Sequence, residues 1–349
     1  MPLPREPRLA IVGATGAVGR ELLTLIHERR FLHASLKLLA SRRSVGSTIA
    51  HGGSDLPVDE CTTEAFAGVD LALFSAGGSV SRSFGPIAAD AGAVVVDNSS
   101  AFRMDPGVPL VVPEVNGSLL DPADPPRIIA NPNCSTIILL VPLQPLRVGF
   151  GIERVIVSTY QAVSGAGAAA MAELDAQTRA VLDGSDPEPK LFSEPCAFNC
   201  FSHDSAVDDA TGRNVEEQKM IDETRKIWGD PGVLVSPTCL RVPVRRAHTE
   251  SVHVTLRRPA SLGAVRACLA DAPGVELLDD RPGNRFPTPL RASDRDPVLV
   301  GRVRPAATSP HEPDAEHTEW ALLLSGDQIR KGAALNALQI AERLLPTSG

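Results

Sequence analysis

One turn near the N-terminus constrains the fold of this 349-residue chain more than any other feature. The apolar run at residues 9–12 stops at a glycine-rich segment, residues 13–19, which reads GATGAVG. An amphipathic segment with Leu22, Leu23 and Ile26 on one face follows it. A buried strand, a glycine-rich turn and a helix, in this order, form the unit that holds the pyrophosphate of a dinucleotide. The sequence therefore predicts an α/β fold that begins with a Rossmann-like dinucleotide-binding domain.

Each glycine of this turn has its own physical use. Gly13 permits the tight turn, Gly16 lets the pyrophosphate approach the backbone, and Gly19 allows close packing of the helix on the strand. The spacing is G-x-x-G-x-x-G rather than G-x-G-x-x-G. The placement between a strand and a helix, and not the spacing alone, supports the prediction.

The residues after the second predicted strand favour NADP over NAD. A strand at residues 36–40 should lie beside the first, and NAD-binding chains usually place Asp or Glu at its end to hold the ribose hydroxyls. This chain has Ser41, Arg42, Arg43 and Ser44 there. Guanidinium and hydroxyl groups suit a 2′-phosphate. The alternative is a solvated basic loop.

The alternation of strands and helices continues through residue 130. We expect a helix at residues 83–91 and strands at residues 69–75, 93–96, 111–113 and 128–130. Residues 97–103 form a polar turn that ends in Arg103, which could face an anion or the solvent.

The segment Asn-Pro-Asn-Cys-Ser-Thr at residues 131–136 carries the first chemical hypothesis. Pro132 blocks a helix before it, and the apolar run at residues 137–141 indicates a buried helix after it. Cys134 is therefore expected on a loop at, or just before, a helix N-terminus, where backbone N–H groups and the helix dipole favour thiolate over thiol. We interpret Cys134 as a nucleophile that forms a thioester. The alternative is a buried structural cysteine.

The next strand, expected at residues 154–159, leads to several candidate groups. Gln161 follows it as a polar group able to orient a carbonyl, and Ser164 and Gly165 could let the backbone meet a nicotinamide. A plain loop explains the glycines nearly as well. An alanine-rich helix at residues 168–182 and a long loop at residues 184–205 should follow.

A capping pattern opens a further helix. Asn214 is a predicted N-cap, and Glu217, three residues on, completes a capping-box pair. Glu216 and Lys219 are three apart and share a helix face. They form either a surface salt bridge or the two ends of a site for a zwitterionic, phosphorylated ligand.

Two basic residues in the segment at 239–248 have candidate roles. Arg241 alternates with apolar neighbours on a strand, so its guanidinium can point into a cleft and capture a carboxylate. His248 is expected in the turn before a strand at residues 251–256, as a general acid or base with little shift from its usual pKa. His253, His311 and His317 receive no role. A strand at 319–325 and a helix at 333–345, which carries Gln339, complete the chain.

Composition excludes several function classes. A formal net charge of −8 argues against nucleic-acid binding. The six cysteines are scattered, which does not indicate a disulfide framework, and the pair Cys196 and Cys200 lacks the partners of a zinc site, so no metal is expected. Because the N-terminus lacks a signal-peptide pattern and no apolar run approaches the ~20 residues of a membrane span, we expect a cytoplasmic protein that does not bind membranes.

These motifs, in this order, resemble those of the aspartate-β-semialdehyde dehydrogenases over nearly the full length. The matching segments are residues 13–19, 41–44, 131–136, 160–167, 216–219, 241–248 and 332–342. The resemblance implies NADPH-dependent conversion of β-aspartyl phosphate to the semialdehyde, a step in the synthesis of lysine, methionine and threonine. It also implies a homodimer or a dimer-based tetramer. Ser47 stands where the family often has lysine, and the proline-rich segment near 305–313 has no counterpart.

The resemblance also implies a role for each candidate residue. Cys134 would be the nucleophile, His248 the acid/base, and Gln161 a positioning group. Arg241 would bind the substrate carboxylate, Glu216 its ammonium, and Arg103 and Lys219 its phosphate. The residues implied in NADP binding are Gly13, Thr15, Gly16, Ala17, Val18, Ser41, Arg43, Ser44, Ser164, Gly165 and Gln339.

The expected organisation and the rival functions follow from the same comparison. We expect residues 1–132 and 332–349 to bind NADP, and residues 133–331 to form an α+β catalytic and dimerisation domain. One rival is a reductase of N-acetylglutamyl phosphate, whose acylated amine would leave Glu216 without an ammonium to meet. Another is a non-catalytic NADP-binding paralogue, against which Cys134, Gln161, Arg241 and His248 all argue.

Overall fold

The computed structural model describes residues 2–306 and 315–346. His311 and most of the proline-rich segment near 305–313 lie outside the described residues. The chain divides into two units, with unit 1 comprising Met1–Asn133 and Ala333–Gly349 and unit 2 comprising Cys134–Gly332. The expected boundaries stood at 132/133 and 331/332.

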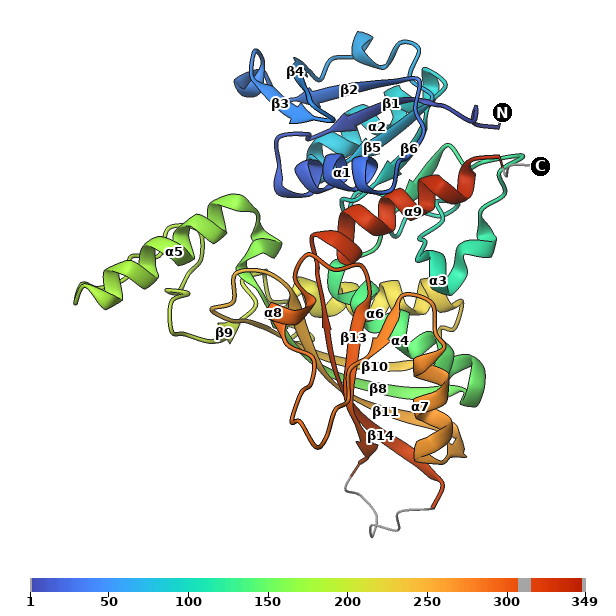
Figure 1. The fold of residues 1–349 in the computed structure, drawn as a ribbon, viewed down its shortest axis with the longest axis vertical. Helices are drawn as coiled ribbons and strands as arrows, with labels where there is room; N and C mark the ends of the chain where they lie inside the picture. The colour runs from blue at the N-terminus through green and yellow to red at the C-terminus, as the bar shows by residue number, and fades with distance from the viewer. Residues whose placement is uncertain (1, 307–314, 347–349) are drawn as a thin grey trace. The chain divides into compact units, whose positions relative to one another are not determined.

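Unit 1 is a sheet with helices on both faces (Figure 1). Among the described residues its strand order is β3-β4-β2-β1-β5-β6-β7, and all neighbours are parallel except β3 and β4. The strands are β1 (Arg8–Val12), β2 (Ser35–Ala40), β3 (Thr48–His51), β4 (Ser54–Glu60), β5 (Leu71–Phe74), β6 (Val94–Asp97) and β7 (Ile128–Ala130). The helices are α1 (Ala17–Glu28), α2 (Gly78–Asp90), α3 (Pro113–Asn116) and α9 (Leu335–Leu344), with 3₁₀ turns at Arg42–Ser44, Glu64–Phe66 and Gly117–Leu119.

Both faces of this sheet are buried, as a parallel sheet requires. Leu9 and Ile11 of β1 pack with the apolar faces of α1 and α9. Ala10 and Val12, which point the other way, pack in a second cluster with Ala88 of α2. The predicted dinucleotide-binding architecture is therefore confirmed, and α9 adds the C-terminal segment to it.

One expected strand is absent. Residues 111–113 were expected to pair as a strand, but Pro113 begins α3, because proline has a fixed φ suited to the first helical position and no N–H to donate to a ladder. The side chain of Asn116 hydrogen-bonds to the neighbouring backbone instead. Its Oδ1 accepts from the N–H of Val112 and its Nδ2 donates to the carbonyl of Leu110, both at 2.9 Å.

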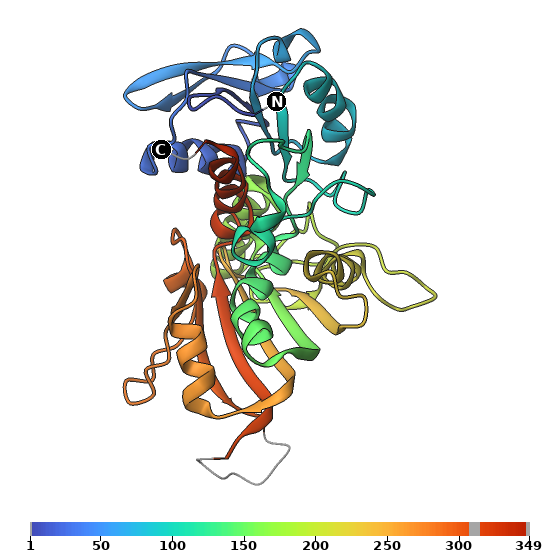
Figure 2. The same ribbon diagram turned by 90° about the vertical axis from the view of Figure 1, so that its right-hand side faces the viewer.

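Unit 2 is a mixed sheet with helices on one face (Figure 2). In the described residues its strand order is β12-β13-β14-β11-β8-β10-β9. The strands are β8 (Ile152–Gln161), β9 (Phe201–Ser202), β10 (Leu234–Arg241), β11 (His248–Ala260), β12 (Val275–Leu277), β13 (Val298–Pro305) and β14 (His317–Gly326). The helices are α4 (Cys134–Phe150), α5 (Ala168–Leu182), α6 (Val215–Trp228), α7 (Leu262–Ala270) and α8 (Pro289–Ala292), with a 3₁₀ turn at Val163–Ala166 and a π-helical turn at Arg330–Ala334.

Strict alternation along the central strands makes this sheet one-sided. On β8, Val155, Val157 and Thr159 are buried, whereas Ile156 and Tyr160 between and beyond them are exposed. The buried side chains face α4, which contacts β8, β11 and β14, and α6, which contacts β10. Any polar residue at a buried position of these strands therefore lies under a helix, on the face where a site can be shielded from water.

Candidate active site

Cys134 is the first residue of α4. Pro132 lies two residues before it, and the following run, residues 137–141, is buried, so the helix begins where the apolar sequence begins. The thiol therefore lies at the positive end of the helix dipole, close to N–H groups that the first turn leaves unpaired within the helix. This position stabilises a negative charge on the sulfur.

The imidazole of His248 lies next to this sulfur. The distance from Cys134 Sγ to His248 Nε2 is 3.5 Å. On the other side of the ring, Nδ1 accepts a hydrogen bond from the backbone N–H of Ala162 at 3.0 Å. Because Nδ1 is an acceptor, the neutral ring carries its proton on Nε2, and this proton points at the sulfur.

Two expectations about His248 were wrong. It is the first residue of β11 and not part of a preceding turn, because it already pairs with Gly326 of β14. Its pKa does not stay near the usual value: complete burial, reinforced by the charge of Arg241, lowers the pKa of His248 to about 3. At neutral pH the ring is therefore uncharged, and it stabilises a thiolate by donating a hydrogen bond.

Register brings Gln161 and Arg241 to the same level of the sheet as His248. Gln161 of β8 pairs directly with Arg241 of the parallel strand β10. Thr249 of β11 pairs with Tyr160, so continuing that antiparallel register by one residue puts His248 at the level of Gln161. We name these three buried side chains, Arg241, Gln161 and His248, the outer row.

The amide of Gln161 is held by two acceptors. Its Nε2 lies 3.3 Å from Thr159 Oγ1 and 3.4 Å from Glu216 Oε1. Glu216, only 4% exposed, also accepts from Lys219 Nζ at 3.1 Å. The predicted salt bridge is therefore present, but it is partly buried and reaches the outer row through Gln161.

The predicted start of α6 explains the position of Glu216. Asn214 Oδ1 accepts from the N–H of Glu217 at 2.9 Å, and Glu217 Oε2 accepts in return from the N–H of Asn214 at 2.9 Å. This capping box is confirmed, and it fixes the first turn of the helix on which Glu216 stands.

Ser164 and Gly165 lie in the 3₁₀ turn Val163–Ala166, which comes shortly after Gln161, the last residue of β8. A Cβ built on Gly165 would lie 3.5 Å from both His248 Nε2 and Arg241 Nη1, so the Gly165 backbone is close to both side chains. Ser164 Oγ is hydrogen-bonded to Gln328 Nε2.

The glycine turn of unit 1 has the form that a pyrophosphate needs. Gly13 follows β1 with φ +88°, and a Cβ there would collide with the carbonyl of Ser75 after β5. Because β1 lies between β2 and β5, this turn stands at a point where the strand order reverses, at the carboxyl ends of the strands. Gly16 is the N-cap of α1, and because it has no side chain it makes no cap hydrogen bond to the N–H groups of the first turn.

The remaining candidates of unit 1 are distributed over three elements. Ser41 precedes the 3₁₀ turn that carries Arg42, Arg43 and Ser44, and both arginines are exposed. Arg103 is buried and donates to the backbone carbonyls of Asn131 at 2.9 Å and Asn98 at 3.0 Å. Gln339 of α9 donates from Nε2 to Glu114 Oε1 at 3.1 Å.

Comparison with known proteins identifies the family. The model of the semialdehyde dehydrogenase NAD-binding domain matches residues 8–123, and that of the semialdehyde dehydrogenase dimerisation domain matches residues 143–331. An aspartate-semialdehyde dehydrogenase of Synechocystis is 48% identical over 343 residues, which cover 98% of both chains.

The chain belongs to the aspartate-semialdehyde dehydrogenase family.

Solved structures of the same family share its fold. Aspartate semialdehyde dehydrogenase II from Vibrio cholerae, complexed with ASA, has a TM-score of 0.91 and 46% identity, covering 97% of this chain and 98% of its own. The enzyme from Candida albicans with NADP has a TM-score of 0.74 and 26% identity, covering 97% and 98%. The α/β fold class and the nicotinamide-binding domain predicted from the motifs are confirmed by these comparisons.

Sequence reasoning within this family pattern missed three polar residues of unit 2. His203 and Asp204, in the long loop after α5, both contact Arg241. Glu250, two residues after His248 on the same strand face, is fully buried. A strand-face position two residues from a candidate histidine was the available signal for Glu250, whereas the loop offered no periodicity from which to place the other two.

Metal and membrane sites find no support in the part of the chain that the structure describes. No group of three or more His, Cys, Asp or Glu side chains is placed to hold a metal ion. Cys196 is buried, Cys200 is exposed, and neither forms a disulfide. Within residues 2–306 and 315–346, none of the helices combines the length and apolarity of a membrane span.

Proposed function

We propose that the chain is an NADP-dependent, phosphorylating aspartate-semialdehyde dehydrogenase. It would convert L-4-aspartyl phosphate to L-aspartate 4-semialdehyde and phosphate, or run the reverse, in lysine, methionine and threonine biosynthesis and the diaminopimelate branch. The observation that carries the proposal is the contact between Cys134 Sγ and His248 Nε2 at the start of a helix, beside Gln161 and Arg241.

The covalent steps are centred on Cys134. Its thiolate forms a bond to the acyl carbon, and the bond from that carbon to the phosphate oxygen breaks, so that phosphate leaves with the electron pair and a thioester remains. A nicotinamide cofactor, when bound, would supply the hydride that reduces the thioester. The resulting tetrahedral oxyanion re-forms its C=O bond as the carbon–sulfur bond breaks, which releases the aldehyde and restores the thiolate.

His248 acts in these steps through its Nε2 proton. It donates to the thiolate before the attack and to the oxygen of the tetrahedral species afterwards, and Gln161 positions the carbonyl. Complete transfer of a proton to the ring would place a hydrogen on Nδ1, against the N–H of Ala162. Acid–base exchange at His248 therefore requires that backbone hydrogen bond to open.

Charged side chains would select and hold the substrate. Arg241 would bind the α-carboxylate, and the buried carboxylate of Glu216 would bind the ammonium. Lys219 and Arg103 would neutralise the phosphate. An ammonium distinguishes the aspartyl substrate from an N-acetylated one, which would leave Glu216 facing a neutral amide.

The cofactor would be NADP, which the Candida albicans relative contains in its solved structure. The N–H groups at the start of α1, from Thr15 to Val18, would hold the pyrophosphate, with Gly13 and Gly16 in the turn. Ser41, Arg43 and Ser44 would hold the 2′-phosphate, since the guanidinium of Arg43 is exposed. Ser164, Gly165 and Gln339 are the further residues that we propose for cofactor binding.

We also propose a homodimer, or a tetramer built from it, in the reducing cytoplasm. The uncovered face of the unit 2 sheet supports the dimer, because Ile156, Tyr160 and Leu234 remain 42%, 38% and 52% exposed on it. The matching domain model describes a dimerisation domain. Free thiols at all six cysteines are typical of a reducing compartment.

The proposal is tested by measuring reduction of NADP with L-aspartate 4-semialdehyde plus phosphate. We expect activity with this substrate to be at least about 10-fold above that with N-acetyl-L-glutamate 5-semialdehyde. We also expect activity with NADP to be higher than activity with NAD. Cys134→Ala should lower kcat by about 10³-fold or more, because no other group replaces the nucleophile. The matched control, Cys200→Ala, removes an exposed thiol and should retain full activity. Full activity in Cys134→Ala would contradict the thioester mechanism.

A further inference from the structure

The guanidinium of Arg241 is almost fully engaged by the protein itself. The residue is 2% exposed, its Nη1 donates to the carbonyl of Ala162 at 2.9 Å, and its Nη2 lies 3.0 Å from His203 Nε2. Its Nε and Nη2 both donate to one oxygen, Asp204 Oδ1, at 3.2 and 2.7 Å. Four of the five N–H groups of this arginine therefore have partners among the described residues.

His203 is a fixed partner of Arg241. An arginine only donates hydrogen bonds, so Nε2 of His203 accepts from it, and on the other side of the ring Nδ1 lies 3.1 Å from Ser205 Oγ and 3.2 Å from the Ser205 backbone N. Burial lowers the pKa of His203, and the charge of Arg241 acts in the same direction. The imidazole therefore stays neutral and keeps its acceptor toward the guanidinium.

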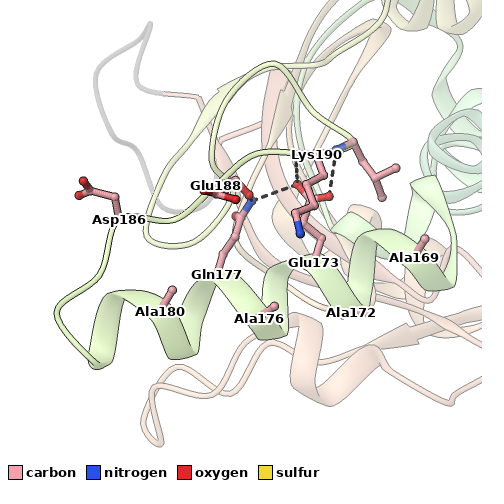
Figure 3. A pocket seen from close by; sticks show the side chains of 10 residues that line it. Ala169, Ala172, Glu173, Ala176, Gln177, Ala180, Asp186, Glu188 and Lys190 are labelled. Carbon is pink, nitrogen blue, oxygen red and sulfur yellow. Dashed lines mark hydrogen bonds between the residues drawn. The ribbon is translucent and has the colours of Figure 1, made fainter.

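The loop behind Arg241 is fastened to α5. The Cζ of Arg241 lies 5.3 Å from the centroid of the Phe192 ring. Immediately before Phe192, the carboxylate of Glu173 on α5 accepts the backbone N–H groups of Lys190 and Leu191, both at 2.9 Å (Figure 3). Phe192 thus provides a stacking surface whose position α5 maintains.

Asp204 differs from these partners because it lies at the rim. Its side chain is 28% exposed, so solvent can hydrate the carboxylate when it leaves the arginine. Burial raises the pKa of Asp204, but the hydrogen bond and the charge of Arg241 together lower it by a larger amount. The pKa of Asp204 is therefore below its usual value. The carboxylate is therefore ionised at neutral pH, and it is the charge that compensates Arg241.

We propose that Asp204 is a resident counterion, which occupies the edge of Arg241 that the substrate carboxylate must take and which therefore sets the affinity for substrate. This inference rests on the proposed role of Arg241 in the function above. When Asp204 leaves, Nε and one N–H of Nη2 become available side by side, which is the arrangement for two-point capture of a carboxylate.

The exchange is favoured by geometry and restricted by charge. One oxygen of Asp204 serves both N–H groups, whereas a small free carboxylate can offer one oxygen to each. A buried guanidinium without a counterion is costly, so only an anion can replace Asp204. Asp204 thus competes with the substrate and at the same time excludes neutral analogues from this edge.

The test measures binding of L-aspartate by calorimetry and KM for L-aspartate 4-semialdehyde in four proteins. In Asp204→Asn the competing charge is lost, and we expect tighter L-aspartate binding and a lower KM, each by roughly 3- to 30-fold, with kcat within about threefold of wild type. Asp204→Glu keeps the compensating charge and serves as the control for correct folding. Its KM should stay at or above the wild-type value. Asp209→Asn, an exposed carboxylate on the same loop, should change neither quantity.

Unchanged or weaker L-aspartate binding in Asp204→Asn would overturn the proposal, because a residue that only positions Arg241 weakens binding when it is removed. A fall in KM for Asp204→Glu equal to that for Asp204→Asn would overturn it as well. A wild-type protein that binds L-aspartate without oxidising the semialdehyde contradicts the proposed function alone. Wild-type activity together with an Asp204→Asn variant whose KM and L-aspartate affinity are both unaltered contradicts the counterion exchange alone.

Discussion

Two neighbouring rows on one face of the unit 2 sheet have similar burial and very different chemistry. The outer row is Arg241, Gln161 and His248. The inner row lies one repeat further along the same three strands and comprises Cys239, Thr159 and Glu250, which pair in register across β10, β8 and β11. All six residues are at most 2% exposed.

Hydrogen bonding separates the two rows. Every member of the outer row has a defined polar partner: Asp204, His203 and Ala162 for Arg241, Thr159 and Glu216 for Gln161, and Ala162 and Cys134 for His248. In the inner row, neither carboxyl oxygen of Glu250 has a partner among the described residues. Burial raises the pKa of Glu250 well above its usual value, so the carboxyl is neutral.

The thiol beside the outer row and the thiol within the inner row differ in the same way. Cys134 begins a helix and faces an imidazole, whereas Cys239 lies against Met220 at 3.7 Å, and burial raises its pKa beyond any physiological range. The sheet supplies both rows with equivalent positions. The start of α4 and the polar loops around the outer row, rather than burial itself, make that row reactive.

The largest expected effect separates His248 from Glu250. His248→Asn removes the donor to Cys134 Sγ and should lower kcat by about 10²- to 10⁴-fold, the usual range for such a group. Glu250→Gln on the same strand face should keep kcat within about threefold. Steady-state assays of both variants measure this difference, and equal losses would remove the distinction between the rows.

A smaller effect is expected for the two residues of β8. Gln161→Leu removes the amide that positions the carbonyl and should lower kcat by about 10²-fold. Thr159→Val removes only one acceptor of that amide, which keeps Glu216 as a partner, so a loss of a few-fold is expected. A Thr159→Val loss as large as that of Gln161→Leu would place the inner row in the catalytic machinery.

The smallest effects are shifts of stability with pH, which have opposite signs in the two rows. The folded pKa of Glu250 is raised, so ionisation above pH ~4.5 favours the unfolded chain and stability falls as the pH rises. The folded pKa of His248 is lowered to about 3, so stability falls as the pH drops below ~6.5.

Thermal unfolding between pH 5 and pH 8 measures these two shifts. Relative to wild type, the Tm of Glu250→Gln should rise by a few degrees toward pH 8, and that of His248→Asn should rise by about as much toward pH 5. Profiles parallel to that of the wild type would show that neither group titrates as its burial requires.

Much of the fold was predictable because local signals and tertiary packing agree. The helix α5 was expected at its observed bounds, and the capping box of Asn214 and Glu217 opens α6 as predicted. The hairpin of β3 and β4 was missed, although Gly52 and Gly53 between two short runs are a hairpin signal. Residues 111–113 were assigned to a strand because their apolar character was weighed above the proline that ends them.

Contacts of the candidate site were predictable only where strand periodicity determines them. Gln161, Arg241 and His248 could be placed near strand ends, and the structure brings them together through register, which a single sequence does not reveal. The pKa of His248 was misjudged because its burial comes from elements distant in sequence. Asp204 was missed because its loop has no periodic sequence pattern. The position of the loop is determined instead by hydrogen bonds to α5 and to Arg241.

The one-sided alternation of β8, β10 and β11 also limits how this enzyme can evolve. One residue inserted or deleted within any of these strands would rotate every following side chain to the opposite face, exchanging the reactive groups for those of the bare face. Changes of length that preserve activity should therefore accumulate in the connecting loops, while the strands admit substitutions only. The bare face can then acquire new contacts between subunits by ordinary point mutation, without altering the reaction.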